Sequence, residues 1–169
     1  MGKLSSLRIG TLNCQGLNDK YKRMAIFDMF QNSDLSIVFL QETKLKPDCH
    51  YQYSEEWTQG ESIFNSIFGG KSGTAILLKG AGMKFCNGTK MLDLEGRVIA
   101  VDLEIFGEKF HAVNSYGPID SRDKISYLNR FTWIVVYLQF GLGIIISHNL
   151  LGLIDILSDW IMIPSPNCR

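Results

Sequence analysis

The stretch LSIVFLQE, residues 35–42, joins a continuous apolar run to a carboxylate at its end. A run this short, with β-branched side chains, predicts a strand that is buried on both faces. Placing an ionised carboxylate at the end of a buried strand is costly unless a cation or hydrogen bonds compensate it. Glu42 is therefore a candidate ligand for a hard cation such as Mg²⁺. The alternative is that Glu42 leaves the sheet into solvent and caps a turn.

Two further predicted strands end in polar residues in the same way. Residues 7–13 read as a strand that ends at Asn13, whose amide could orient Glu42 or a phosphate. Tyr116 follows a strand at residues 109–115, and its hydroxyl could donate a hydrogen bond to a phosphate or a leaving oxygen. The alternative for Tyr116 is simple packing over Pro118.

The remaining patterns alternate between helical and strand periodicity. Residues 20–31 predict an amphipathic helix with Met24, Phe27 and Phe30 on its buried face and Arg23 on the polar side. We expect residues 45–60 to form an irregular loop with at most one helical turn. Further elements are predicted as paired strands at 61–67 and 74–78, a hairpin of 98–105 with 109–115, a helix at 121–139 and a strand at 144–146. This order predicts a layered α/β domain in which hairpins and helices share two sheets.

Composition indicates an ordinary globular domain. Hydrophobic residues make up 46% of the 169 residues, and 17 basic residues balance 17 acidic ones, so any binding of a polyanion needs a local basic face. The four cysteines are scattered, which favours reduced thiols in a nuclear or cytoplasmic compartment. We expect no small-molecule cofactor, and the sequence indicates nothing about oligomeric state.

The stretch 131–154 contains no Asp, Glu, Lys or Arg and is long enough to cross a bilayer. Its polar residues, and the glycines at 141 and 143, are costly inside a lipid-facing helix. We therefore expect a buried helix, a break and a buried strand, with one membrane segment as the less favoured alternative.

Five short motifs together resemble a known family in order and spacing. The sequence resembles the endonuclease/exonuclease/phosphatase superfamily, and within it the apurinic-type, exonuclease III-like endonuclease domain of LINE-type non-LTR retrotransposons. The likeness covers roughly residues 7–120. Its motifs are TLNCQGL (11–17), FLQETK (39–44), GTAIL (73–77), EGRV (95–98) and NSYGP (114–118).

This resemblance implies a four-layer α/β sandwich, with two β-sheets flanked by helices, that hydrolyses DNA phosphodiesters. It implies that Glu42 binds Mg²⁺ or Mn²⁺, that Asn13 assists at the metal and the phosphate, and that Tyr116 supports the transition state. Arg97 would contact the substrate. In such a reaction the metal lowers the pKa of its bound water and neutralises charge on the phosphate, while protein groups position the reactants.

The C-terminal part departs from the family pattern. Asn149 stands where the family carries an aspartate, and Leu151 where it carries an asparagine. An amide cannot accept a proton as a carboxylate does. The family's later Asp-His pair would fall beyond Arg169. We therefore expect a partial sandwich at residues 5–155 with an incomplete C-terminal half, a non-family tail at 156–169, and weak or absent activity; the alternative is a dead remnant that only binds DNA or metal.

Overall fold

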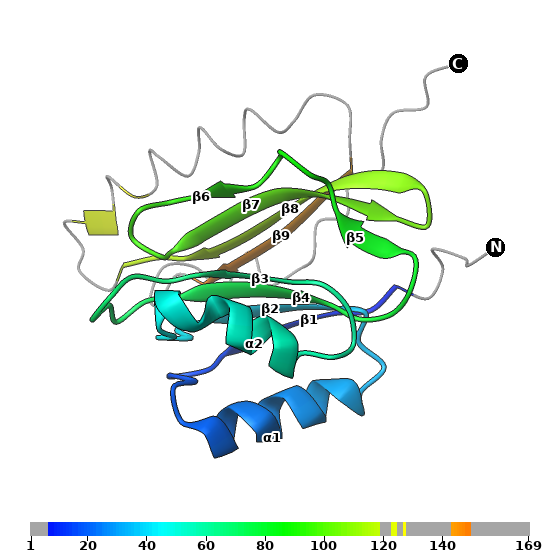
Figure 1. Cartoon of the computed structure of the whole chain (residues 1–169). Helices are drawn as coiled ribbons and strands as arrows, with labels where there is room; N and C mark the ends of the chain where they lie inside the picture. Colours follow the sequence, from blue (N-terminus) through cyan, green and yellow to red (C-terminus); the bar gives the residue numbers. More distant parts are fainter. Residues whose placement is uncertain (1–6, 119–122, 125–126, 128–142, 150–169) are drawn as a thin grey trace.

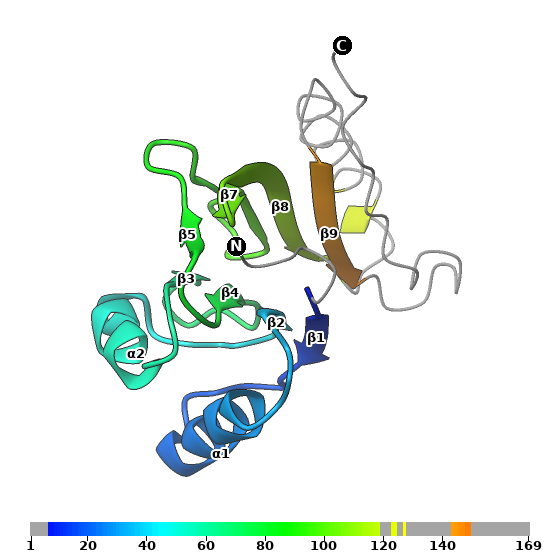
Figure 2. The same ribbon diagram turned by 90° about the vertical axis from the view of Figure 1, so that its right-hand side faces the viewer.

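The computed structural model describes residues 7–118, 123, 124, 127 and 143–149. Two β-sheets lie face to face, and the helices α1 (Lys20–Gln31) and α2 (His50–Glu56) cover the outer face of the first sheet (Figures 1 and 2). A short 3-10 helix, Pro47–Cys49, leads into α2. The predicted partial α/β sandwich of two β-sheets is confirmed, with the described helices α1 and α2 on the first sheet. The helix predicted at residues 121–139 falls mostly outside the described residues.

The first sheet has four strands in the order β1-β2-β4-β3. Its strands are β1 (Ile9–Asn13), β2 (Ile37–Gln41), β3 (Ser62–Asn65) and β4 (Thr74–Leu78). The first two strands are parallel, with Asn13 opposite Gln41, and helix α1 makes the crossover between them. The other pairs are antiparallel, as predicted for β3 and β4. The sheet thus brings Asn13 and Glu42 to the same end.

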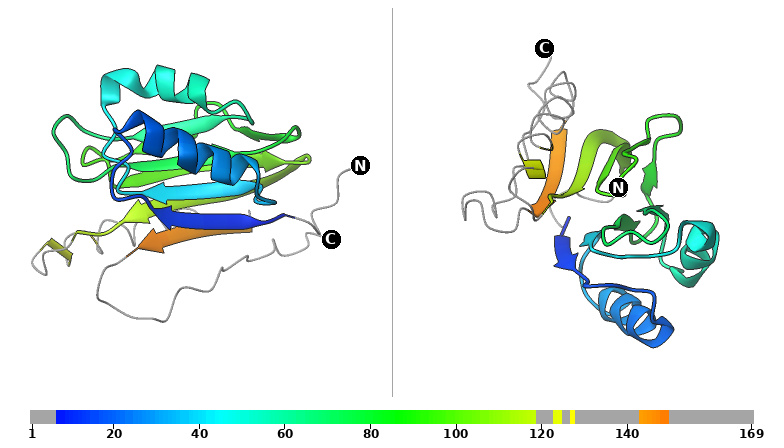
Figure 3. Two further views of the ribbon diagram at one scale, coloured as in Figure 1. Left: turned by 90° about the horizontal axis from the view of Figure 1, so that it is seen from below. Right: turned by 90° about the vertical axis from the view of Figure 1, so that its left-hand side faces the viewer.

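The second sheet is built on the predicted hairpin and has the order β5-β7-β8-β9, with β6 pairing to β7. Its strands are β5 (Met83–Phe85), β6 (Met91–Leu92), β7 (Val98–Ile105), β8 (Glu108–Tyr116) and β9 (Gly143–Asn149). Strand β9 contains the predicted strand at 144–146 and runs parallel to β8, with residue 149 opposite Tyr116. The carboxyl ends of β1, β2, β8 and β9 therefore point to one end of the sandwich (Figure 3).

The apolar core has two parts because strand β2 is covered on both faces. Ile37 and Phe39 of β2 pack between the two sheets, whereas Val38 and Leu40 pack beneath the helices. All five residues of β2 are buried. Burial on both faces explains why the sequence of β2 is continuously apolar.

Two local predictions were wrong. On helix α1 the buried residues are Arg23, Phe27 and Phe30, while Met24 is 47% exposed. Arg23 is buried because its guanidinium makes two hydrogen bonds to the Glu56 carboxylate at the end of α2. Residues 47–56, predicted as an irregular loop, form the 3-10 helix and α2, which supply that partner.

No helix within the described part of the chain is long and apolar enough to cross a membrane. Of the stretch 131–154, the structure describes only residues 143–149, and these form strand β9 rather than part of a helix. The rest of that stretch, Leu151 and the tail at 156–169 lie outside the described residues.

Candidate active site at the strand ends

The three residues singled out at strand ends meet around one carboxylate. Oε1 of Glu42 accepts a hydrogen bond from Asn13 Nδ2 at 3.0 Å and another from the Tyr116 hydroxyl at 2.6 Å. Oε2 lies 3.3 Å from Lys44 Nζ. The Glu42 side chain is 14% exposed, so its charge is compensated by three donors while one side remains open to solvent. The sequence missed Lys44, which comes from the loop that follows the strand.

The backbone around Glu42 is held in an unusual conformation. Glu42 has a φ of 50° and Lys44 a φ of 52°, both in the left-handed region that side chains seldom adopt. The loop after β1 fixes this path, because the amides of Cys14, Gly16 and Leu17 donate to the carbonyls of residues 41, 42 and 43 at 2.7 to 2.8 Å. This ladder sets the direction in which the carboxylate points.

Gly73 secures the other side of the same loop. Its carbonyl accepts from the Thr43 amide at 3.0 Å, and Ser72 accepts from the Lys44 amide at 2.9 Å. A Cβ on residue 73 would lie 2.3 Å from Thr43 Oγ1 and 2.7 Å from Lys44 N. Only glycine therefore allows this close approach, which explains the glycine in the GTAIL motif.

Hydrogen bonding keeps Glu42 ionised and Tyr116 protonated. Burial raises the pKa of Glu42, but the hydrogen bonds from Tyr116, Asn13 and Lys44 outweigh burial, so the pKa lies below its ordinary value. Burial and the neighbouring Glu42 carboxylate raise the pKa of Tyr116 to about 12. The site thus pairs a carboxylate that is ionised at neutral pH with a hydroxyl that keeps its proton there and donates it in a hydrogen bond.

The orientation of Asn13 follows from its two partners. A carboxylate only accepts and a backbone amide only donates, so Asn13 turns Nδ2 to Glu42 and Oδ1 to the Gln15 amide, 3.1 Å away. In this arrangement Asn13 orients the carboxylate, and its own oxygen is occupied. Both residues predicted to hold a metal therefore place oxygen atoms at the site, Asn13 through Oδ1 and Glu42 through its carboxylate.

Arg97 lies directly beside Tyr116. Its guanidinium carbon is 5.6 Å from the centre of the Tyr116 ring, and the backbones of the two residues bond through the Tyr116 amide and the Arg97 carbonyl at 2.9 Å. Glu95 also contacts the guanidinium, at 3.4 Å. The predicted substrate contact is therefore placed next to the candidate site, with its positive charge partly neutralised.

A buried polar network beneath the site joins the two sheets, and no pattern in the sequence predicts it. Asn114 of β8 donates to the carbonyls of Leu40 and Ala75 at 2.9 and 2.8 Å and accepts from Gln41 Nε2 at 2.8 Å. Gln41 also donates to Thr11 of β1 at 3.0 Å. Asn114 is fully buried. These bonds fix the distance and register between the strand that carries Glu42 and the strand that carries Tyr116.

Asn149, predicted to replace a catalytic aspartate, ends strand β9. In the parallel register of β8 and β9 its backbone lies opposite Tyr116. The chain position expected for a water-activating residue is therefore next to the Glu42 cluster, and an asparagine occupies it.

The chemistry of the cluster fits one hard divalent cation. Glu42 offers a fixed, ionised carboxylate, and the Lys44 side chain beside Oε2 is 36% exposed. Among the described residues no three His, Cys, Asp or Glu side chains gather in one place. A cation here would have one protein carboxylate and would complete its shell with water or phosphate, as Mg²⁺ often does.

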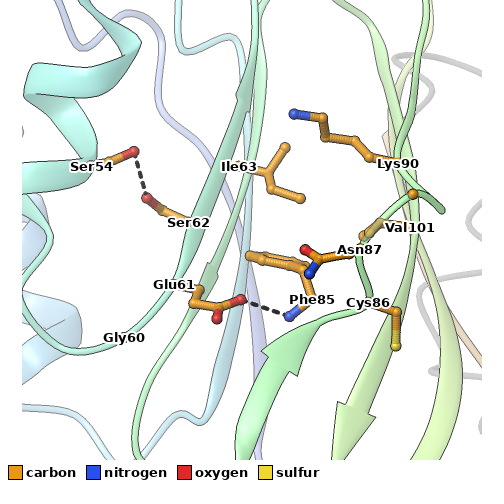
Figure 4. Close-up of a pocket in the computed structure, with 11 residues that line it drawn as sticks. Ser54, Gly60, Glu61, Ser62, Ile63, Phe85, Cys86, Asn87, Lys90 and Val101 are labelled. Carbon is orange, nitrogen blue, oxygen red and sulfur yellow. Dashed lines mark hydrogen bonds between the residues drawn. The ribbon is translucent and has the colours of Figure 1, made fainter.

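A cavity of about 480 Å³ lies away from the Glu42 cluster, between the edge strands β3 and β5 of the two sheets. Figure 4 shows Glu61, whose carboxylate accepts from the Phe85 amide at 2.7 Å, and the Ser54 and Ser62 hydroxyls, which bond at 3.0 Å. Ser62 pairs with Leu77, and Asn65, at the other end of β3, pairs with Thr74 beside Gln41. The cavity therefore lies towards the end of the sandwich opposite to Glu42.

The two facing sheets, with polar strand ends gathered at one end, form a fold that is known from other proteins. Solved structures of TDP2 share it. TDP2 from Caenorhabditis elegans is 16% identical with a TM-score of 0.59, over 84% of this chain and 46% of its own. A humanized D. rerio TDP2 with 14 mutations is 15% identical with a TM-score of 0.62, over 84% of this chain and 65% of its own.

The chain spans less than two thirds of the length of these structures. At this level of identity the likeness establishes the fold. No protein-family model and no curated protein matches the sequence.

Proposed function

We propose that this chain is part of a divalent-metal phosphodiesterase domain that acts on DNA, with Mg²⁺ or Mn²⁺ held by Glu42. The observation that carries the proposal is the Glu42 carboxylate, which is held at the end of a buried strand by Asn13, Tyr116 and Lys44. An ionised carboxylate held in one orientation at a partly exposed strand end is the arrangement that a metal-dependent phosphodiesterase needs. The TDP2-like fold supports the same class.

The side chains of the cluster would have different roles around the phosphate. A bound cation would supply charge neutralisation and a more acidic water. Glu42 would hold it, Asn13 would keep Glu42 oriented and assist at the phosphate, and Tyr116 would donate a hydrogen bond to a phosphate oxygen while keeping its proton. Arg97 would add positive charge beside Tyr116.

Proton removal from water is the weak step in this chain. The residue beside Tyr116 on β9 is Asn149, and an amide does not accept a proton at neutral pH. We propose that the chain descends from a LINE-type, exonuclease III-like endonuclease and that its hydrolysis of DNA is weak or absent. The motifs TLNCQGL and FLQETK support that origin.

Metal binding and nicking test the two parts of this proposal separately. Thermal unfolding is measured with Mg²⁺ or Mn²⁺ and with chelator for the wild type, Glu42→Gln and the charge-matched control Glu108→Gln, at the far end of β8. We expect the cation to raise the Tm of the wild type and the control but not of Glu42→Gln. Equal responses of all three proteins would contradict the metal site.

Single-turnover nicking of a supercoiled plasmid tests the activity. We expect little or no Mg²⁺-dependent nicking by any of the three proteins. Robust nicking by the wild type and Glu108→Gln that disappears in Glu42→Gln would support the phosphodiesterase class and contradict the expected impairment.

A further inference from the structure

A separate cavity of about 340 Å³ adjoins the Glu42 cluster. It lies between the loop after β2 and the turn that joins β3 to β4, and Lys44, Lys46, Ile67 and Phe68 line it. Lys44 is part of both the cavity lining and the Glu42 cluster, because its ammonium group lies 3.3 Å from Glu42 Oε2. Anything bound in this cavity would therefore sit one side chain away from the candidate metal site.

The turn at one side of the cavity holds an aromatic ring out of the core. Phe68 is 74% exposed. The Gly70 amide bonds to the Ile67 carbonyl at 3.1 Å, and Gly69 has a φ of 63°, so these residues form a tight turn with Phe68 at its tip. A Cβ on residue 70 would lie 2.4 Å from Ile67 Cγ1, so Gly70 leaves room for the Ile67 side chain below the ring.

Two lysines, Lys44 and Lys46, line the opposite side of the cavity, and no acidic side chain lines it. Asn18 also lines the cavity, and its amide bonds to the Lys44 carbonyl, which ties the loop after β1 to the lysines. An exposed aromatic ring and two lysines at one cavity combine a surface for stacking with a complement for phosphate.

We propose that this cavity binds an unpaired nucleotide of the DNA, with its base stacked on Phe68 and its phosphate next to Lys44 and Lys46. The inference deepens the proposed function, on which it rests for the phosphodiester at Glu42. Stacking needs an exposed base face, which a duplex does not offer in its interior, so the substrate class is DNA with a single-stranded or unpaired segment. A volume of about 340 Å³ is in the range of sites for small ligands.

Binding of labelled oligonucleotides tests this without any need for turnover. Fluorescence anisotropy with chelator present gives the affinity of the wild type, Phe68→Ala, Phe68→Trp and the control Phe106→Ala for a single-stranded oligodeoxynucleotide. Phe106 is also an exposed phenylalanine, but it lies in the turn between β7 and β8, at the end of the sheet remote from Tyr116. The same proteins are titrated with a duplex and with a strand whose bases are replaced by abasic sites.

We expect Phe68→Ala to weaken binding of the single strand by roughly fivefold or more, as is usual for loss of one stacked base. Phe68→Trp and Phe106→Ala should bind like the wild type, and the abasic strand should not distinguish Phe68→Ala from the wild type. Equal affinity of Phe68→Ala and the wild type for the single strand, or tighter binding of the duplex by all proteins, would overturn the inference.

Glu42→Gln separates this inference from the proposed function. Because Glu42 does not line the cavity, this variant should bind the single strand at least as tightly as the wild type while losing its response to Mg²⁺. If Mg²⁺ raises the Tm of the wild type but Phe68→Ala binds the single strand as tightly as the wild type, the nucleotide site is refuted and the metal site is not. If Mg²⁺ leaves the Tm of the wild type unchanged but Phe68→Ala weakens binding of the single strand, the metal site is refuted and the nucleotide site is not.

Discussion

Removing the hydroxyl of Tyr116 tests the geometry of the Glu42 cluster directly. In Tyr116→Phe the buried ring is kept and only the 2.6 Å bond to Glu42 Oε1 is lost. A hydrogen bond to a charged group contributes about 1.5 to 3 kcal/mol, whereas a bond between neutral groups contributes about 0.5 to 1.5 kcal/mol. Because Glu42 keeps Asn13 and Lys44 as partners, we expect a loss of about 1.5 kcal/mol in the free energy of unfolding at pH 7.

A double-mutant cycle isolates that bond. Tyr116→Phe, Glu42→Gln and the double variant are unfolded in urea, and Tyr51→Phe serves as the control because Tyr51 is exposed on α2. We expect the loss caused by Tyr116→Phe to fall by about 1 kcal/mol in the Glu42→Gln background, since the bond then joins two neutral groups. Tyr51→Phe should leave stability unchanged.

The pH dependence provides a second check with a defined sign. The folded pKa of Glu42 is below its ordinary value of 4.5, so its ionised form stabilises the fold above that value and this contribution is lost as the pH falls through the folded pKa. Tyr116→Phe removes one donor and raises the folded pKa. The stability difference between the wild type and Tyr116→Phe should therefore shrink as the pH is lowered below 4.5. A cycle that is additive within about 0.5 kcal/mol, together with a difference that does not change with pH, would refute the described geometry.

Two further variants test features that support the site. Asn114→Leu leaves two buried carbonyls without their donor, at roughly 1 to 3 kcal/mol each, so urea unfolding should show a loss of about 3 kcal/mol; a loss below about 1 kcal/mol would contradict the cross-sheet network. His50 has a pKa below its ordinary value of 6.5, because of burial and then because of Lys90, and its ring bonds to Ser66 at 2.6 Å. The unfolded state therefore binds more protons just below pH 6.5, so stability should fall as the pH drops from 6.5, and this slope should be smaller in His50→Gln. An equal slope in both proteins would show that His50 is not the group responsible.

The sequence predicted elements well where one pattern dominated. The run at residues 35–41 and the alternation at 98–105 mark β2 and β7 because each has an unambiguous period. Strands β5 and β6 were missed, since three and two residues are too few to show any period. Arg23 was placed on the wrong face because its burial depends on Glu56, a partner 33 residues away.

The candidate site was predictable only in part, for a similar reason. Asn13, Glu42 and Tyr116 could be found because each follows a strand, and carboxyl ends of neighbouring strands meet at one edge. The contact of Lys44 with Glu42 depends on the left-handed backbone of both residues, and Asn114 and Leu40 are 74 positions apart in the sequence. No local pattern therefore predicts either contact. No pattern in the sequence distinguishes Phe68 from other loop residues, because its exposure and its neighbours are set by the folded turn.

The ladder between the loop after β1 and residues 41–43 would make the proposed cation affinity a property of the whole of strand β1. Among the described strands, β1 lies at an edge of the first sheet and pairs with β2 alone, so its docking depends on that pairing and on this ladder. If β1 detached, Asn13 would leave and the backbone of Glu42 would lose its restraint in the same event. The apparent Kd for a cation therefore equals the intrinsic Kd divided by the fraction of molecules with β1 docked. A substitution anywhere along β1 that lowers this fraction will weaken metal binding without touching the site.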